Sequence, residues 1–515
     1  MLSEKAQRLG AKYGHKLKYI RGQETNRTRA FYFGDKSMAP SPAGKPVVAA
    51  NASYWAVPTV GAGGPVLVQP LSASGKASYA STPVLSGHKA EVTDLAFSPF
   101  RDELLASGSA DSIVQIWSVS DNGDDGVSGS VLQTLTGHER GIRTVQFHPT
   151  AANVLCSSGF DMTLRLWDVE TAQERTCVAG KLDDAAWNVA FNDDGDLLAT
   201  SSRAKVVRVF DPRQSEHALV AMGCGFDSAK PQFVQWASAL QLVTVGVNGR
   251  NETQLSFWDA RSLLEPLAAP VTVESSASSA TLFPYYDASS RLLFLVGLGS
   301  RQIWSYELEP ETATAHANLP FMLAGQTAMC GAALLPKTLC DIRNVELDRL
   351  LVVTPSAVEQ VAFSVPRAEK LKEFFQDDVY APVRRRAPLL SADEWFEGAA
   401  IPAPEFESLC PEGSLCWSVA RRDRSNRVGV DDAGMVALSE RPKETVVARP
   451  KTLDFQAQLR REEELARAKA EQFERLSTLA AQPSLHQLHH RGAASTKPPA
   501  AAATNDADSD DDWDD

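Results

Sequence analysis

The chain has 515 residues, 43% of which are hydrophobic, and a formal net charge of −13. This length supplies enough apolar material for a large folded core, and the acidic balance argues against nucleic acid as the main partner. No apolar run approaches the roughly twenty residues of a membrane span, and the N-terminus lacks the apolar region of a secretory signal, so we expect no integral membrane segment.

The seven cysteines are spaced irregularly and form no CxxC pair. This pattern argues against a zinc site or a disulfide framework and indicates reduced thiols in a cytoplasmic protein. The sequence also lacks a glycine-rich phosphate loop and a nucleophile elbow. We therefore expect no metal, no cofactor and no enzymatic activity.

The N-terminal part of the chain is basic, and residues 1–26 form a basic extension. Farther along, two strand-like runs, VVAANASYWAVPTV and PVLVQPLS, lie within residues 47–71. Their apolar and β-branched residues are typical of short, largely buried strands. They predict a short first sheet ahead of a longer series of repeats.

An internal repeat follows. GHKAEVTDLAFSP, from Gly87, aligns with GHERGIRTVQFHP, from Gly137, and LASGSADSIVQIWSV aligns with LCSSGFDMTLRLWDV, all at an offset of 50 residues. Gly-His followed by Trp-Asp at this period is the signature of a WD-repeat propeller blade.

Four residue types recur at matching positions in these two repeats. His88, Ser107, Asp111 and Trp117 in the first correspond to His138, Ser157, Asp161 and Trp167 in the second. A His–Asp–Ser set also has the composition of a catalytic triad, but an active site is rarely duplicated from repeat to repeat. The resemblance to WD repeats implies a structural hydrogen-bonded network that ties the outer strands of each blade together.

The later repeats are degenerate. One has Thr200 at the serine position, Ala204 in place of the aspartate and Phe210 in place of the tryptophan. The count is about seven units of the expected length. We therefore predict an all-β fold, a seven-bladed WD-repeat β-propeller over residues 27–367, whose closed ring protects the sheet edges.

The periodic strands stop after Arg367, and four further segments are expected. They are an irregular C-terminal extension over 368–420, a charged linker over 421–452, a short helix over 453–480 and a disordered tail over 481–515 that ends in an acidic motif, 505–515.

Motifs outside the generic repeat resemble the coronin family over roughly residues 27–410. They are the FDPR and FWDAR blade ends, LFPYYD, the VPR of Val365–Arg367, FQDDVY (Phe375–Tyr380) and DEWFEG (Asp393–Gly398). The resemblance implies that the extension packs under the propeller, with Phe375, Tyr380 and Trp395 as aromatic anchors.

Coronins bind filamentous actin through basic residues on the propeller, which suits the acidic surface of actin. The candidates in this sequence are Arg27, Arg29, Lys36 and Lys45. Phe33 and Gly34 match the family, but the segment after them departs from its pattern and is shorter. The alternative interpretation of these residues is a solvated charged edge.

Coronins commonly end in an oligomerising helix, so residues 453–480 are a candidate coiled coil. Their apolar seam contains charged residues and alanines, and a solitary helix stabilised by local ion pairs is the alternative. At the C-terminus, Asp510, Asp511, Asp512, Trp513, Asp514 and Asp515 resemble the acidic motif that binds the branched-actin nucleating complex, the complex of actin-related proteins. Acidic tails are otherwise solvating segments.

Three functions follow from these features. The leading one is an actin-filament-binding scaffold of the cytoplasm and the actin cytoskeleton, whose partners are filamentous actin, the nucleating complex and a second copy of the chain. The second is a WD-repeat adaptor for another assembly, such as one in trafficking or ubiquitin transfer. An enzyme built on the propeller is the third and least expected, since a fold alone does not argue for chemistry.

Overall fold

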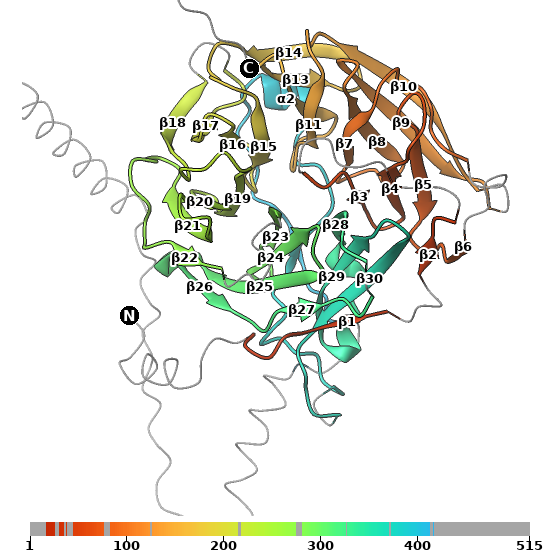
Figure 1. Ribbon diagram of the computed structural model, residues 1–515, viewed down its shortest axis with the longest axis vertical. Coiled ribbons are helices and arrows are strands. Elements are labelled where there is room, and N and C mark those ends of the chain that lie inside the picture. The colour runs from red at the N-terminus through yellow and green to blue at the C-terminus, as the bar shows by residue number, and fades with distance from the viewer. Residues whose placement is uncertain are drawn as a thin grey trace, which may run out of the picture. The chain divides into compact units, whose positions relative to one another are not determined.

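The protein is a ring of seven small β-sheets, as a computed structural model shows (Figure 1). The structure describes residues 17–25, 30–34, 38, 45–76, 83–123, 126–214, 218–273, 281–325, 327–369, 372–411 and 416. The prediction of a seven-bladed propeller is confirmed. Among the described residues, no helix is long and apolar enough to cross a membrane.

The two clear repeats form two four-stranded antiparallel sheets. The strands of the first are β7 (Val92–Phe97), β8 (Leu104–Ser109), β9 (Ile113–Asp121) and β10 (Val127–Thr136). Those of the second are β11 (Ile142–Phe147), β12 (Val154–Gly159), β13 (Leu164–Asp168) and β14 (Gln173–Val178). Each sheet carries a register shift near the start of its first strand, between Val92 and Asp94 and between Ile142 and Thr144. The repeat in the sequence is therefore a repeat in backbone geometry too.

Three further sheets continue the ring, and a three-stranded sheet precedes the clear repeats. Their strands are β15 (Ala186–Phe191), β16 (Leu198–Ser202), β17 (Val206–Phe210) and β18 (Leu219–Cys224); β19 (Phe233–Ser238), β20 (Gln241–Val247), β21 (Thr253–Asp259) and β22 (Val271–Thr272); β23 (Thr281–Asp287), β24 (Leu292–Leu298), β25 (Gln302–Glu309), β26 (Thr314–Ala317) and β27 (Phe321–Met322); and β3 (Ala49–Ala50), β4 (Tyr54–Pro58) and β5 (Val66–Pro70). The first strand of each sheet faces the centre of the ring (Figure 1).

The seventh sheet closes the ring by joining both ends of the propeller. It combines β28 (Gly331–Leu334), β29 (Glu346–Val353) and β30 (Ala357–Ser364) with β2 (Phe31–Tyr32) and β6 (Gly75–Lys76). Strand β1 (Arg21–Glu24) also pairs with β30. The N-terminal extension expected over 1–26 therefore contributes a strand to the closing sheet, which its basic composition did not indicate.

The C-terminal extension crosses the face of the ring where the first and second strands of the blades are joined. Its short helix α2 (Ala392–Phe396) begins with a capping box between Ser391 and Glu394, and β31 (Val383–Arg384) pairs with β32 (Phe406–Glu407). Leu389 N–H donates to the Thr150 carbonyl (2.8 Å), and Arg386 bonds Asp102 (2.7 Å). In Figure 1 the helix lies beside β13 and β15.

Trp395 is completely buried where the extension meets the ring. Its ring centroid lies 4.5 Å from that of His148, whose Nε2 donates to the Gly195 carbonyl (2.8 Å). Burial lowers the pKa of His148 to about 4, so the imidazole is neutral and apolar enough to pack against the indole. At the other end of the extension, Phe375 stacks on Tyr380, whose hydroxyl donates to the Glu346 carbonyl (2.7 Å).

We expect Trp395→Ala to lower the free energy of unfolding by about 3–5 kcal/mol, because it leaves a large cavity under the extension. Trp395→Phe should cost much less, since the indole Nε1 is buried without a hydrogen-bond partner and its loss removes an unsatisfied donor. Urea unfolding checks both, with Phe406→Ala as the control because that residue is 62% exposed. Equal costs for Trp395→Ala and Phe406→Ala would contradict the anchoring role.

Candidate functional site

In both clear repeats the histidine lies between an aspartate and a serine. His88 Nδ1 is 3.0 Å from Asp111 Oδ2 and its Nε2 is 2.7 Å from Ser107 Oγ, and Trp117 Nε1 donates to the same Oγ at 2.8 Å. The second repeat has the same arrangement, with 2.8 Å for His138–Asp161, His138–Ser157 and Trp167–Ser157. The network links the turn before the first strand of the blade to its second and third strands.

The hydrogen bonds assign every proton in this network. Burial lowers the pKa of His88 and of His138, so both rings are neutral at neutral pH. The carboxylate only accepts, so Nδ1 carries the proton and Nε2 accepts from the serine hydroxyl. The serine oxygen then accepts from the tryptophan, and Ser107 and Ser157 are fully buried. A nucleophile would need an accessible hydroxyl, and these two are saturated and enclosed, so the arrangement is that of a structural link.

The third repeat has lost the network. Thr200 Oγ1 is buried without a hydrogen-bond partner, because Phe210 stands where the tryptophan stands in the two clear repeats and has no N–H to donate. In the fourth, Trp258 Nε1 donates to Thr244 Oγ1 (2.8 Å), so the indole–hydroxyl half of the network survives alone.

Lys45 forms an ion pair with Asp94, with its Nζ 2.5 Å from Oδ2. Asp94 is buried on β7 and also accepts from the N–H of Val145 on β11 (2.8 Å). Burial raises the pKa of Asp94, and the Lys45 charge opposes that shift. Lys45 therefore neutralises a carboxylate that joins two blades, and its side chain is only 15% exposed.

The other predicted binding residues lie outside the described part of the chain. They are Arg27, Arg29 and Lys36, and the acidic residues Asp510–Asp512, Trp513, Asp514 and Asp515. The candidate helix 453–480 and the linker 421–452 also lie outside it. These assignments remain predictions.

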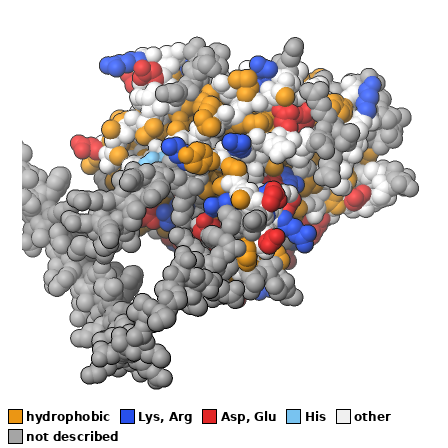
Figure 2. Space-filling model, turned by 90° about the horizontal axis from the view of Figure 1, so that it is seen from below, with side chains coloured by type: hydrophobic (Ala, Val, Ile, Leu, Met, Phe, Trp, Pro, Cys, Tyr) orange, Lys and Arg blue, Asp and Glu red, His pale blue; other side chains and the backbone are white. Residues whose placement is uncertain are grey.

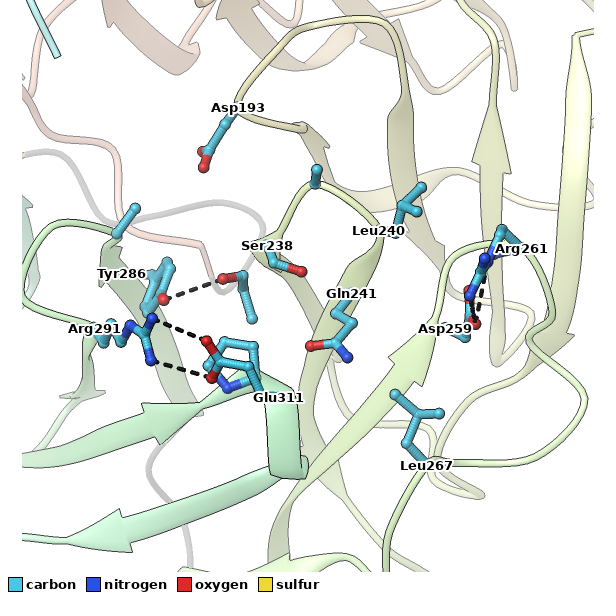
Figure 3. Close-up of a pocket in the computed structure, with 14 residues that line it drawn as sticks. Asp193, Ser238, Leu240, Gln241, Asp259, Arg261, Leu267, Tyr286, Arg291 and Glu311 are labelled. Carbon is cyan, nitrogen blue, oxygen red and sulfur yellow. Dashed lines mark hydrogen bonds and ion pairs between the residues drawn. The ribbon is translucent and has the colours of Figure 1, made fainter. Parts of the chain in front are cut away.

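A cleft of about 670 Å³ opens between the sheet β19–β22 and the sheet β23–β27 (Figure 3). Two ion pairs line it: Arg291 bonds both oxygens of Glu311 at 3.0 and 3.1 Å, and Arg261 bonds Asp259 at 2.7 Å. The hydroxyl of Tyr286 donates to the Ala237 carbonyl (3.2 Å). These two ion pairs balance each other's charge, and Asp193 also lines the cleft.

On the face of the molecule in Figure 2, positive and negative side chains of the described residues are interspersed with hydrophobic ones. No group of three or more His, Cys, Asp or Glu side chains in the described part of the chain is placed to hold a metal ion.

Sequence reasoning missed two sets of charged residues whose pairings join distant parts of the chain. Asp94 was not recognised as the partner of Lys45, although an aspartate within the apolar run VTDLAF signals a buried carboxylate. In the extension, Arg384 donates to the Asp193 carbonyl and Arg386 pairs with Asp102. These two partners lie on loops of two blades that are far away in the sequence. No local signal predicts such pairs.

Ser157→Ala should destabilise the propeller by about 1–3 kcal/mol, because it leaves a buried imidazole nitrogen and a buried indole N–H without partners. Thr200→Val is the matched control. It removes a hydroxyl from the equivalent position of the next blade, where that hydroxyl has no partner, and should cost little. The midpoint of urea unfolding measures both, and equal shifts would argue against the network.

Known proteins match the chain at three levels. A family model described as "WD domain, G-beta repeat" matches residues 80–118, 129–168 and 175–211, and one described as "Type of WD40 repeat" matches residues 358–402. The solved WD40 domain of Toxoplasma gondii coronin covers 77% of the chain and 99% of its own length, with a TM-score of 0.69 and 24% identity, which supports the fold.

Among curated relatives, Coronin-A of Dictyostelium discoideum is 40% identical over 353 residues, which are 68% of this chain and 76% of that protein. The coronin-like protein of Saccharomyces cerevisiae is 33% identical over 67% of this chain and 53% of its own length. Coronin-7 of Mus musculus is 35% identical over 73% of this chain, and the match spans 40% of that longer protein. The chain belongs to the coronin family.

Proposed function

We propose that this protein is a scaffold without catalytic activity that binds actin filaments through its propeller and acts at the actin cytoskeleton in the cytoplasm. The observation that carries the proposal is its membership of the coronin family, shown by a relative that is 40% identical over 353 residues. The saturated, buried His–Asp–Ser sets support a binding role over a catalytic one.

The filament contact is proposed for the closing blade. Arg27 and Arg29 lie in the sequence between β1 and β2, and both strands pair with β30. Lys18 and Arg21, which precede them, are exposed. Lys45 is a different case, because its charge already serves Asp94, so a substitution there would disturb the packing of two blades as well as any binding.

Charge reversal of Arg27, Arg29 and Lys36 together should weaken filament binding by about tenfold or more, since exposed charges contribute up to about 1 kcal/mol each. Co-sedimentation with actin filaments across a salt series measures this, and the unmodified chain should bind less tightly as salt rises.

Arg250→Glu, at an exposed position on the β20–β21 turn, is the control and should bind like the unmodified chain. Failure of the unmodified chain to sediment with filaments at low salt would contradict the proposal and favour an adaptor for another assembly. Unchanged binding by the triple variant would indicate that the filament contact lies elsewhere on the propeller.

The acidic motif 505–515 is proposed to bind the branched-actin nucleating complex, and residues 453–480 to associate with a second copy. Seven of the eleven residues of the motif are Asp and one is Trp, so an apolar anchor lies within a run of negative charge.

Deletion of residues 505–515 should abolish pull-down of the purified nucleating complex and leave filament co-sedimentation unchanged, because the two contacts use different parts of the chain. Trp513→Ala should reproduce most of the loss if the indole is the anchor. Equal pull-down by the deletion variant and the unmodified chain would contradict the proposed binding of residues 505–515 to the nucleating complex.

A further inference from the structure

Three largely buried charged side chains meet where the sheet β23–β27 contacts the closing sheet. They are Asp287 at the end of β23, Lys337 in a 3₁₀ turn, and Asp348 on β29, whose side chain is only 3% exposed. The Lys337 ammonium bonds Asp287 and lies 3.5 Å from Asp348 Oδ1. Although burial lowers the pKa of Lys337, the two carboxylates raise it further, so the ammonium stays charged. With both carboxylates ionised, the junction would hold one negative charge more than its ammonium balances, and such a charge is costly to bury.

One serine hydroxyl lies between the two carboxyl groups. Ser290 Oγ is 2.6 Å from Asp287 Oδ2 and 2.8 Å from Asp348 Oδ2, and Ser290 itself is buried. A hydroxyl has a single proton to donate, and an ionised carboxylate can only accept. Ser290 therefore satisfies both contacts only if one of the two carboxyl groups is protonated and donates to the serine oxygen.

The other hydrogen bonds identify which carboxyl group carries that proton. Asp287 Oδ2 accepts from the Ser290 N–H at 2.8 Å and from the Lys337 ammonium, and the Ser289 hydroxyl adds a bond at 2.8 Å. Burial raises the pKa of Asp287, but the Lys337 charge and these bonds outweigh it, so that pKa lies below its usual value. Burial and the Asp287 charge together raise the pKa of Asp348 to about 7. Asp348 is therefore the group that holds the proton.

Two further titratable groups and one ion pair surround Asp348. Burial raises the pKa of the Cys340 thiol and of the Tyr380 hydroxyl, so both stay protonated near neutral pH. On the same strand, Glu346 pairs with Arg349 at 2.6 Å, so these two charges balance each other. A change in charge at this junction near neutral pH therefore comes from Asp348.

The junction lies beside the strands that close the ring. Asp348 is on β29, which pairs with β30, and β30 pairs with β1 and β2 from the N-terminal part of the chain. The Tyr380 hydroxyl of the extension donates to the carbonyl of Glu346, two residues before Asp348. The charge of Asp348 therefore acts on the sheet that holds both the closure of the ring and one end of the extension.

We propose that Asp348 and Asp287, bridged by Ser290, form a proton-binding link between the sheet β23–β27 and the closing sheet, which weakens when the proton is released. Release of the proton to solvent leaves two carboxylates against one hydroxyl, and Lys337 offsets their repulsion only in part. The link makes closure of the ring respond to pH. The inference goes beyond the proposed function and does not rest on it, since neither actin nor the nucleating complex takes part.

Asp348 stabilises the folded protein most when it is protonated. Its pKa in the folded protein lies above the ordinary value of 3.8, so the folded state binds the proton more tightly than the unfolded chain does. The resulting stability is complete below a pH of about 4 and is lost as the pH rises to about 7. At higher pH the group is ionised in both states, and no further stability is lost.

Urea unfolding of the full-length chain and of Asp348→Asn, between pH values of about 5 and about 8.5, tests the link. The asparagine amide keeps the shape and donates to Ser290 Oγ as the protonated carboxyl group does, but it cannot ionise. Relative to Asp348→Asn, the unfolding equilibrium constant of the unmodified chain should rise about tenfold per pH unit from about 5 to about 7 and then level off. The control is Asp227→Asn, at a side chain that is 88% exposed beside Lys205, which should differ from the unmodified chain by a constant amount.

Asp287→Asn keeps the test decisive if Asp348→Asn does not fold. Without the neighbouring negative charge the pKa of Asp348 falls, so unfolding of this variant should also depend less on pH than unfolding of the unmodified chain. A pH dependence retained in full by either folded variant would overturn the proton-binding link, because Asp348 would then not be the group that gains and loses the proton.

Discussion

Pairing of the N-terminal strands with β30 is the interaction on which the rest of the structure depends. A blade by itself presents unpaired strand edges and half of an apolar face, so it is stable only between two neighbours. Phe31 and Phe33 pack edge-on to Trp55, so closure also joins the last sheet to the first, β3–β5. With the ring closed, each blade packs between two neighbouring blades.

The extension adds a second constraint, across the ring and not around it. It bonds Asp102, Thr150 and the Glu346 carbonyl, which belong to three different blades. It also buries Trp395 against a histidine kept neutral by burial. Near these blades, that face of the ring therefore largely contacts the extension.

Repetition identifies structural chemistry in this protein. The His–Asp–Ser–Trp sets recur with nearly the same distances, and each hydrogen bond in them is satisfied within its blade. Arg143 breaks the repeat and is not satisfied within its own blade or the next.

The amino-acid sequence alone determined the repeat, the blade count, the two internal networks and the motifs of the coronin family. These features are local, because both partners of each hydrogen bond lie within one repeat at a constant separation. Closure by β1, the pairing of Lys45 with Asp94 and the contact of Trp395 with His148 were decided only by the tertiary structure. Each joins residues from separate parts of the chain, and the curvature of the ring, which no single repeat encodes, brings them together.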